Sequence, residues 1–136
     1  MAVSTYVNNI GNTIVQTDVV SSTLTTTDLA IFQTTGSGMV ITECIVRTDA
    51  TGLAGGTNLV LKADGIVFFS TAVSGLGASS VKDVKNASVT GSKVSIPDGV
   101  KNITIATTVA NGTGAGVANV TLVCQNVISN ATIRPL

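Results

Sequence analysis

The chain consists of short runs of apolar and β-branched residues that are separated by glycine, asparagine and aspartate. Branched side chains fit a pleated, half-buried surface, so each run predicts a β-strand. We expect about eight to ten strands, with helix limited to one turn near residues 71–76. The pattern therefore predicts a single all-β domain, an antiparallel β-sandwich or barrel.

Two regions of this pattern are specific enough to predict individual strands. The run at 39–48 is the most continuous apolar stretch, which is typical of a central strand covered on both faces. The runs at 58–62 and 66–71 flank Asp64 and Gly65. Because a type I′ turn needs positive φ at both central residues, Asp-Gly predicts a hairpin here.

The last third of the chain alternates most regularly. The run 103–109 places Ile103, Ile105 and Val109 on one face, and a second alternating run covers 120–128. A glycine-rich stretch at 111–116 lies between them. A phosphate-binding loop would require a helix to follow the glycines, whereas a strand follows here. We therefore predict a second hairpin with a wide, flexible tip.

The start of the chain differs from the rest. Residues 3–10 alternate weakly and are interrupted by Asn8, Asn9 and Gly11, and a further apolar run follows at 13–20. We divide the chain accordingly: residues 1–20 are predicted to form an extended N-terminal arm or swapped strand, and residues 21–136 the sandwich. An extended segment can add a strand to a neighbouring subunit. The residues expected to bind a partner are Val3, Thr5, Tyr6, Val7, Ile10, Thr13 and Ile14.

Composition changes the picture of the surface. Isoleucine, valine and threonine fill 52 of the 136 positions, whereas seven basic and seven acidic residues give a net charge of zero. A neutral chain lacks the positive field that attracts nucleic acid or anionic lipid, so neither is expected as a direct partner. A solitary domain usually carries about 25% charged residues. At 10% charged residues, we expect part of this surface to be covered by copies of the chain and by another protein.

Candidate catalytic chemistry is sparse. The chain has no histidine, so the usual base beside a nucleophile is missing. The lysines that could replace it stand in polar, turn-flanked sequence, which favours solvated side chains: Lys62, Lys82, Lys85, Lys93 and Lys101. We expect no enzymatic activity.

The carboxylates and cysteines have simpler explanations than a site. Asp64 and Asp98 stand in predicted turns. Asp49 with neighbouring oxygen atoms could hold calcium, and this alternative to a turn role stays open. Cys44 and Cys124 lie in apolar runs, where buried thiols are expected and a disulfide between sheets is the alternative. No cofactor or metal site is predicted.

Three stretches carry a resemblance to a known class of proteins. They are Val-Arg-Thr-Asp-Ala-Thr-Gly-Leu-Ala-Gly-Gly-Thr-Asn at 46–58, Ala-Ser-Val-Thr-Gly at 87–91 and Ala-Asn-Gly-Thr-Gly-Ala-Gly at 110–116. In their overall pattern of residue types, residues 40–125 resemble the capsid decoration, or cement, proteins of tailed bacteriophages. The resemblance contains no invariant motif, so it transfers no functional residue. It implies a jelly-roll-like sandwich that assembles as a homotrimer on the outside of the head.

These observations lead to one functional expectation and one alternative. We expect a virion structural protein that binds the major capsid protein and stabilises the shell, located on the capsid surface. The first residues lack a secretory signal and no run is long enough to cross a bilayer, so synthesis in the host cytoplasm is expected. The alternative is a head-fibre, tail or spike domain that binds a host surface receptor through the loops 48–57 and 110–116.

Overall fold

The computed structural model describes residues 12–36, 38–85, 94–126 and 130–136, and within these ranges it consists almost entirely of strands. The strands are β1 (Asn12–Val20), β2 (Leu29–Thr35), β3 (Met39–Thr48), β4 (Asn58–Ala63), β5 (Ile66–Ala72), β6 (Val81–Lys85), β7 (Val94–Ile96), β8 (Lys101–Thr107), β9 (Val117–Asn126) and β10 (Thr132–Pro135). Two short 3-10 turns, η1 (Ser21–Thr23) and η2 (Val73–Gly75), are the described helical elements. None of the described segments forms a helix long and apolar enough to cross a membrane. The all-β prediction is confirmed.

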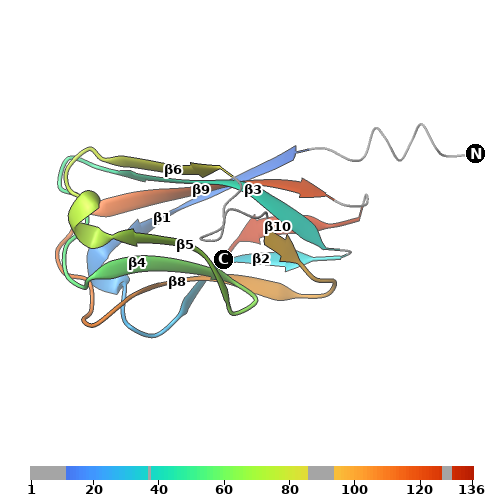
Figure 1. Cartoon of the computed structure of the whole chain (residues 1–136), viewed down its shortest axis with the longest axis horizontal. Helices are drawn as coiled ribbons and strands as arrows, with labels where there is room; N and C mark the ends of the chain where they lie inside the picture. The colour runs from blue at the N-terminus through green and yellow to red at the C-terminus, as the bar shows by residue number, and fades with distance from the viewer. Residues whose placement is uncertain (1–11, 37, 86–93, 127–129) are drawn as a thin grey trace, which may run out of the picture.

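The strands form two antiparallel sheets that pack face to face (Figure 1). The first sheet has the order β1-β9-β3-β6, with β7 pairing with β3 beside β6. The second has the order β10-β2-β8-β4-β5. If β6 and β7 are taken as one interrupted edge strand, the chain winds between the sheets in the order of a jelly roll, with β10 added at the edge. The predicted jelly-roll-like sandwich is confirmed.

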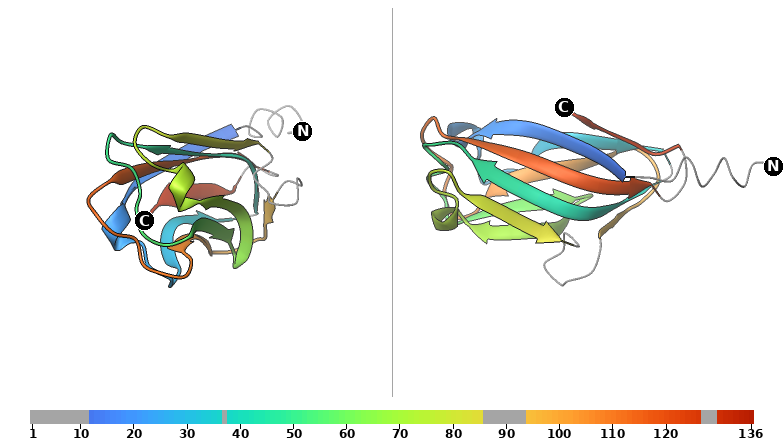
Figure 2. Two further views of the ribbon diagram at one scale, coloured as in Figure 1. Left: turned by 60° about the vertical axis from the view of Figure 1, so that its left-hand side comes forward. Right: turned by 90° about the horizontal axis from the view of Figure 1, so that it is seen from above.

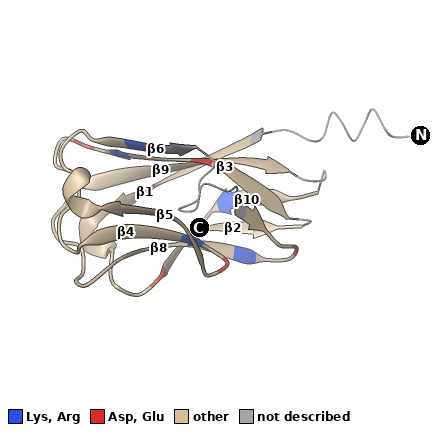
Figure 3. Ribbon diagram, viewed as in Figure 1, with Lys and Arg blue, Asp and Glu red and all other residues tan. Residues whose placement is uncertain are grey.

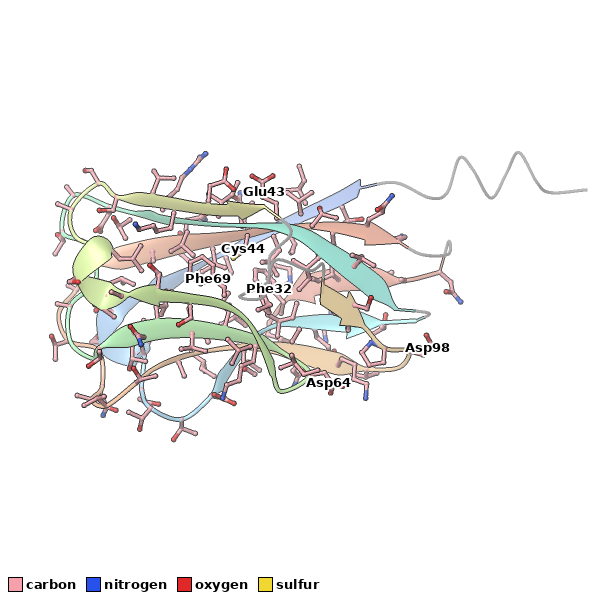
Figure 4. The ribbon with its side chains drawn as sticks, in the orientation of Figure 1. Phe32, Glu43, Cys44, Asp64, Phe69 and Asp98 are labelled. Carbon is pink, nitrogen blue, oxygen red and sulfur yellow. The ribbon has the colours of Figure 1, made fainter. Side chains whose placement is uncertain are left out.

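The hydrophobic core fills the space between the sheets. Period-two alternation turns one side of each strand inward, as in β9, where Ala118, Val120, Leu122 and Cys124 are buried. Phe32 from one sheet and Cys44 from the other both lie between the layers, whereas Glu43 lies on the outer side of β3 (Figure 4). The register shift between Ile41 and Glu43 lets Ile41 and Cys44 both face inward.

Both cysteines are free and buried, so the thiol interpretation is confirmed and the disulfide alternative is wrong. Burial raises the pKa of Cys44 far above its usual value and that of Cys124 to about 12. A thiol must ionise to react as a nucleophile. Both groups are therefore inert packing residues.

Two of the locally predicted elements have the expected form. Residues 39–48 form β3, which pairs with β9 on one side and with β6 and β7 on the other. The hairpin of β4 and β5 turns at Asp64 and Gly65, whose φ values of 50° and 81° are both positive. The Asp-Gly pair therefore provides the backbone geometry that a type I′ turn requires.

The predicted hairpin in the last third of the chain is wrong. β8 pairs with β2 and β4 in one sheet, whereas β9 pairs with β1 and β3 in the other. Their glycine-rich connection crosses the roughly 10 Å between packed sheets. Each of the two strands buries one face in the same core. Both therefore show the alternation of apolar and polar residues that two paired strands would show, although they do not pair with each other. Val109, predicted to face inward, lies beyond the end of β8 and is 85% exposed.

The predicted arm, residues 1–20, divides at residue 12. Residues 12–20 form β1, which pairs with β9 over nine consecutive positions in the same chain. This part of the arm is an ordinary sheet strand, because Val15 and Val19 alternate into the core. Residues 1–11 lie outside the described residues, so an arm there stays a prediction.

Candidate interaction surfaces

Four connections meet at one end of the sandwich and form a surface that we call the cap (left in Figure 1). The cap comprises residues 21–28, 49–57, 73–80 and 108–116, the links β1–β2, β3–β4, β5–β6 and β8–β9. These residues include no lysine, arginine or aromatic side chain, and their only charges are Asp28 and Asp49. Figure 3 shows how little of the ribbon is charged. The cap is therefore a sparsely charged surface of threonine, serine, alanine, asparagine and glycine.

The two loops proposed for receptor contact lie side by side in the cap. The N–H of Thr113 donates to the carbonyl of Ala54 at 2.8 Å, and these residues form an isolated antiparallel bridge. The buried Ser21 hydroxyl joins the β1–β2 link to the same point. It donates to the Ala54 carbonyl at 3.0 Å and accepts the Ala54 N–H at 3.1 Å. The predicted flexible tip at 111–116 is therefore wrong, because neighbouring loops hold its backbone.

Glycines let the cap backbones approach each other closely. A Cβ atom on Gly116 would overlap the carbonyl oxygen of Gly52, and one on Gly112 would overlap the carbonyl oxygen of Ser21. Gly52 itself has φ of 78° and lies against the backbone of Gly77. No side chain larger than hydrogen fits at these contacts. The sequence pattern showed many glycines in loops, but not that glycines from different loops touch.

Asp49 organises the β3–β4 link. Its Oδ1 accepts the N–H groups of Thr51 at 3.0 Å and Gly52 at 2.8 Å. These backbone donors, that of Gly52 first, hold the pKa of the Asp49 carboxyl below its usual value. Among the described residues, no group of three or more His, Cys, Asp or Glu side chains comes together. The oxygen considered as a calcium ligand instead fixes a turn.

Val109 is the most exposed large apolar side chain of the cap, and its backbone is unusual. Its φ is 71°, a left-handed value that β-branched residues rarely adopt. The N–H of Ala110 donates to the carbonyl of Thr108 at 2.8 Å across it, which makes a γ-turn. The N–H of Thr57 also donates to that carbonyl, at 2.9 Å. The cap thus presents one apolar side chain on a backbone held from both sides.

A second candidate surface is an open depression of about 350 Å³ on the outside of the β2–β8–β4 sheet. Its lining residues are Asp28, Gln33, Asp64, Gly65, Val100, Lys101, Asn102 and Thr104. Each carboxylate already faces a lysine: Lys62 Nζ lies 3.1 Å from Asp28 Oδ1, and Lys101 Nζ lies 3.7 Å from Asp64 Oδ2. Two of the lysines considered as bases are therefore engaged in surface ion pairs.

The residues predicted to bind a partner fall at the other end of the molecule. Val3, Thr5, Tyr6, Val7 and Ile10 lie outside the described residues. Thr13 and Ile14 lie near the start of β1, at the end opposite the cap (Figure 1). Thr13 is half-buried, whereas Ile14 is 68% exposed on an edge strand. Of this set, the structure therefore presents Ile14 as an available apolar contact.

Comparison with known proteins adds little to this description. No protein-family model matches the chain, and no curated protein does so either. Among solved structures, the chain is similar to one in the structure of infectious bursal disease virus, Gx strain, with 14% identity and a TM-score of 0.28. The alignment covers 91% of this chain but 39% of that one. At so low a TM-score the likeness carries no argument, and the jelly-roll assignment depends on the strand order.

Proposed function

We propose that the chain is a virion structural protein, and specifically a capsid decoration protein of a tailed bacteriophage. In this proposal it binds the major capsid protein on the outside of the head as a homotrimer and catalyses no reaction. The jelly roll is an architecture that capsid domains share with lectins and cupins, so the fold permits the role without assigning it. A neutral surface rich in threonine suits contact between proteins better than contact with phosphate.

The observation that carries the proposal is the difference between the two ends of the sandwich. The cap is held together by hydrogen bonds within the chain, whereas β1 begins at the opposite end, directly after the predicted arm. We therefore orient the subunit with the start of β1 toward the shell and the cap away from it.

The mechanism is thermodynamic linkage. A protein that binds the assembled shell, and not its separated subunits, raises the stability of the shell by mass action. A trimer contacts the shell at three places, so weak individual contacts add through effective concentration. The seven predicted partner residues, Val3, Thr5, Tyr6, Val7, Ile10, Thr13 and Ile14, are the proposed shell contact.

The test uses capsid shells, made without this protein, of the phage that encodes it. The full chain should co-sediment with these shells, and a variant lacking residues 2–11 should bind them more weakly while keeping its thermal melting temperature. Equal binding by both proteins would show that the arm does not attach. No binding by either would contradict the decoration role.

A second candidate function has one observation in its favour. The loops 48–57 and 110–116, proposed for receptor contact, are joined in the cap beside the exposed Val109. A head-fibre, tail or spike domain would use this surface against a host receptor. Binding of the labelled, purified chain to host cells, lost in Val109→Ser, would favour this function over decoration.

A further inference from the structure

The two sheets share a lateral side that is built differently from the rest of the surface. The edge strands β1 and β10 contact each other there, one from each sheet. Figure 2 shows β10 running along the outer side of β1 when the molecule is seen from above. β10 covers β2 only from Phe32 onward, so Leu29 also lies at this side. We call this side, made of β1, β10, Leu29 and Leu136, the β1–β10 margin.

The strands β1 and β6 are edges of the first sheet, and β10 and β5 are the edges of the second. These four strands differ in their protection against pairing with another chain. Three of the five residues of β6 are charged. β10 is four residues long and contains Arg134 and Pro135, and the pairing of β5 with β4 shifts register at Leu61. Charges, proline, shortness and bulges all discourage edge-to-edge association.

β1 has one of these features, the single charge of Asp18, and lacks the others. It is nine residues long, contains no lysine, arginine or proline, and keeps an unbroken register with β9. Nine residues of extended strand span about 30 Å. Among the described strands, β1 is therefore the longest edge and the least protected.

Exposed apolar side chains also concentrate at this margin. Of the eight large hydrophobic residues that are exposed in the described part of the chain, four lie here: Ile14 at 68%, Leu136 at 55%, Leu29 at 40% and Val20 at 37%. The N–H of Leu136 donates to the carbonyl of Ile31 at 3.0 Å, which holds this leucine beside β2. The other four, Ile66, Val81, Val100 and Val109, are distributed over the rest of the surface.

Each charged side chain of the margin makes a hydrogen bond to a neutral amide side chain of a neighbouring strand. Asp18, the only charge on β1, accepts a hydrogen bond from Asn119 Nδ2 at 2.8 Å. Arg134 on β10 donates to Gln33 Oε1 at 2.8 Å. The margin also carries one charge of each sign. Two copies of this surface can therefore approach each other without strong repulsion, as the zero net charge of the chain also allows.

We propose that the β1–β10 margin is the contact between copies of this chain, and that it faces the symmetry axis of the homotrimer. In a closed ring of three identical subunits each contact joins two different patches, so β1 of one subunit would meet another part of the margin of its neighbour close to the axis. This inference depends on the oligomer in the proposed function, but not on binding to a shell. The inference assigns a second role to Ile14. This residue is proposed above as a shell contact, and it would also lie between subunits of the trimer.

The test is sedimentation velocity of the purified full chain with a matched pair of variants. Ile14→Lys places a charge in the margin. Ile66→Lys makes the same change at a residue of nearly equal exposure, 65%, on the edge strand β5 of the opposite side. Ile14→Lys should weaken self-association by about 30-fold or more, as expected when an interface hot spot is removed. Ile66→Lys should leave it unchanged.

A second measurement covers the case in which Ile14→Lys fails to fold. In Ile14→Cys and Ile66→Cys, a short bismaleimide should link subunits of the first variant and not of the second. The buried thiols Cys44 and Cys124 should not react. Leu136→Lys, at the last residue, should also weaken association without affecting the core.

The results separate the two proposals. A wild-type oligomer that is lost in Ile14→Lys and kept in Ile66→Lys supports the margin. A monomeric wild type at high concentration, or an oligomer that survives both Ile14→Lys and Leu136→Lys, would overturn the margin as the contact. Either of these results leaves shell binding, which is measured separately by co-sedimentation, to stand or fail on its own.

Discussion

The cap and the β1–β10 margin both contain few charged residues, but they differ in how many of their backbone groups are hydrogen-bonded within the chain. In the cap, four connections donate hydrogen bonds to one another, as from Leu53 to Leu76 and from Ser21 to Gly116. At the margin, β1 pairs with β9 on one side, and within the described residues it has no strand partner on the other. The cap is complete within one chain, whereas the margin has the backbone groups and apolar side chains that another chain could use.

This difference teaches where to look for function in a fold whose described residues bring together no group of three or more His, Cys, Asp or Glu side chains. Backbone groups that are already paired add little to an association, whereas an open strand edge provides both hydrogen bonds and register. Exposure of single hydrophobic residues is ordinary on protein surfaces. Their concentration beside the least protected edge is the informative feature.

The largest expected effect comes from disturbing the closest backbone contact in the cap. Gly116→Ala places a Cβ atom onto the carbonyl of Gly52, so we expect a loss of about 3 kcal/mol or more in the free energy of unfolding. In Gly77→Ala the added Cβ meets no heavy atom within 4 Å, and a change within about 0.5 kcal/mol is expected. Urea denaturation of both variants measures the difference, and equal losses would mean that the cap is not closely packed.

Removing the hydroxyl that joins two cap loops should have the next largest effect. Ser21→Ala leaves the N–H of Ala54 without its buried partner, although the Ala54 carbonyl keeps the N–H of Thr113, and the loss costs about 1–3 kcal/mol. Ser22→Ala, on an exposed neighbour, should change stability by no more than about 0.5 kcal/mol. Thermal unfolding compares the two variants, and a Ser21→Ala protein as stable as Ser22→Ala would contradict the bridging role.

Asp49 should make the stability of the cap depend on pH at the acidic end. Its folded pKa lies below its unfolded value of about 3.9. The extra stability is therefore fully present above that unfolded value and is lost as pH falls through the folded pKa. Asp49→Asn should lower the melting temperature slightly at pH 6, by less than Ser21→Ala does. The difference in melting temperature between the wild type and Asp49→Asn should shrink as pH falls below about 3.9, and a difference that does not shrink would mean that the charge of Asp49 is not responsible.

The smallest effect is expected at Lys62, which lies outside both regions and pairs with Asp28 at the border of the cap. Lys62→Met removes the ion pair with Asp28 on the outer face of the second sheet, where both side chains are partly exposed. Such surface pairs contribute about 0–1 kcal/mol, so the variant should unfold within about 0.5 kcal/mol of the wild type. Urea denaturation in low and high salt checks this. A loss comparable to that of Ser21→Ala would contradict the description of this contact as a weak surface ion pair.

The sequence predicted what depends on local chemistry. The apolar run at 39–48 identified the inner strand β3, and Asp64 with Gly65 identified the β4–β5 turn. Alternation correctly indicated the buried Ile103 and Ile105 of β8 and the buried Val120, Leu122 and Cys124 of β9, but not the exposed Val109. It could not indicate that the two strands belong to different sheets, because both sheets bury their inward faces in one core.

The surfaces were less predictable than the strands. The glycines of the loops 48–57 and 110–116 were visible, but their contacts join positions more than 50 residues apart along the chain, as between Ala54 and Thr113. Such contacts depend on topology, which alternation does not encode. The apolar run at 13–20 was visible in the sequence, but that it pairs with β9 of the same chain, rather than with a neighbour, emerges only in the fold. Ile14 was named as a partner contact, although its position beside β10 emerges only in the fold.

Hydrogen exchange of the wild-type chain, compared between dilute and concentrated solution, tests the central difference most directly. The account predicts that amides of the cap, such as those of Ser21 and Thr113, are already protected in the dilute protein and change little on association. Amides of β1 on the side away from β9 should gain protection as the oligomer forms. Protection gained in the cap, with β1 unchanged, would contradict the account.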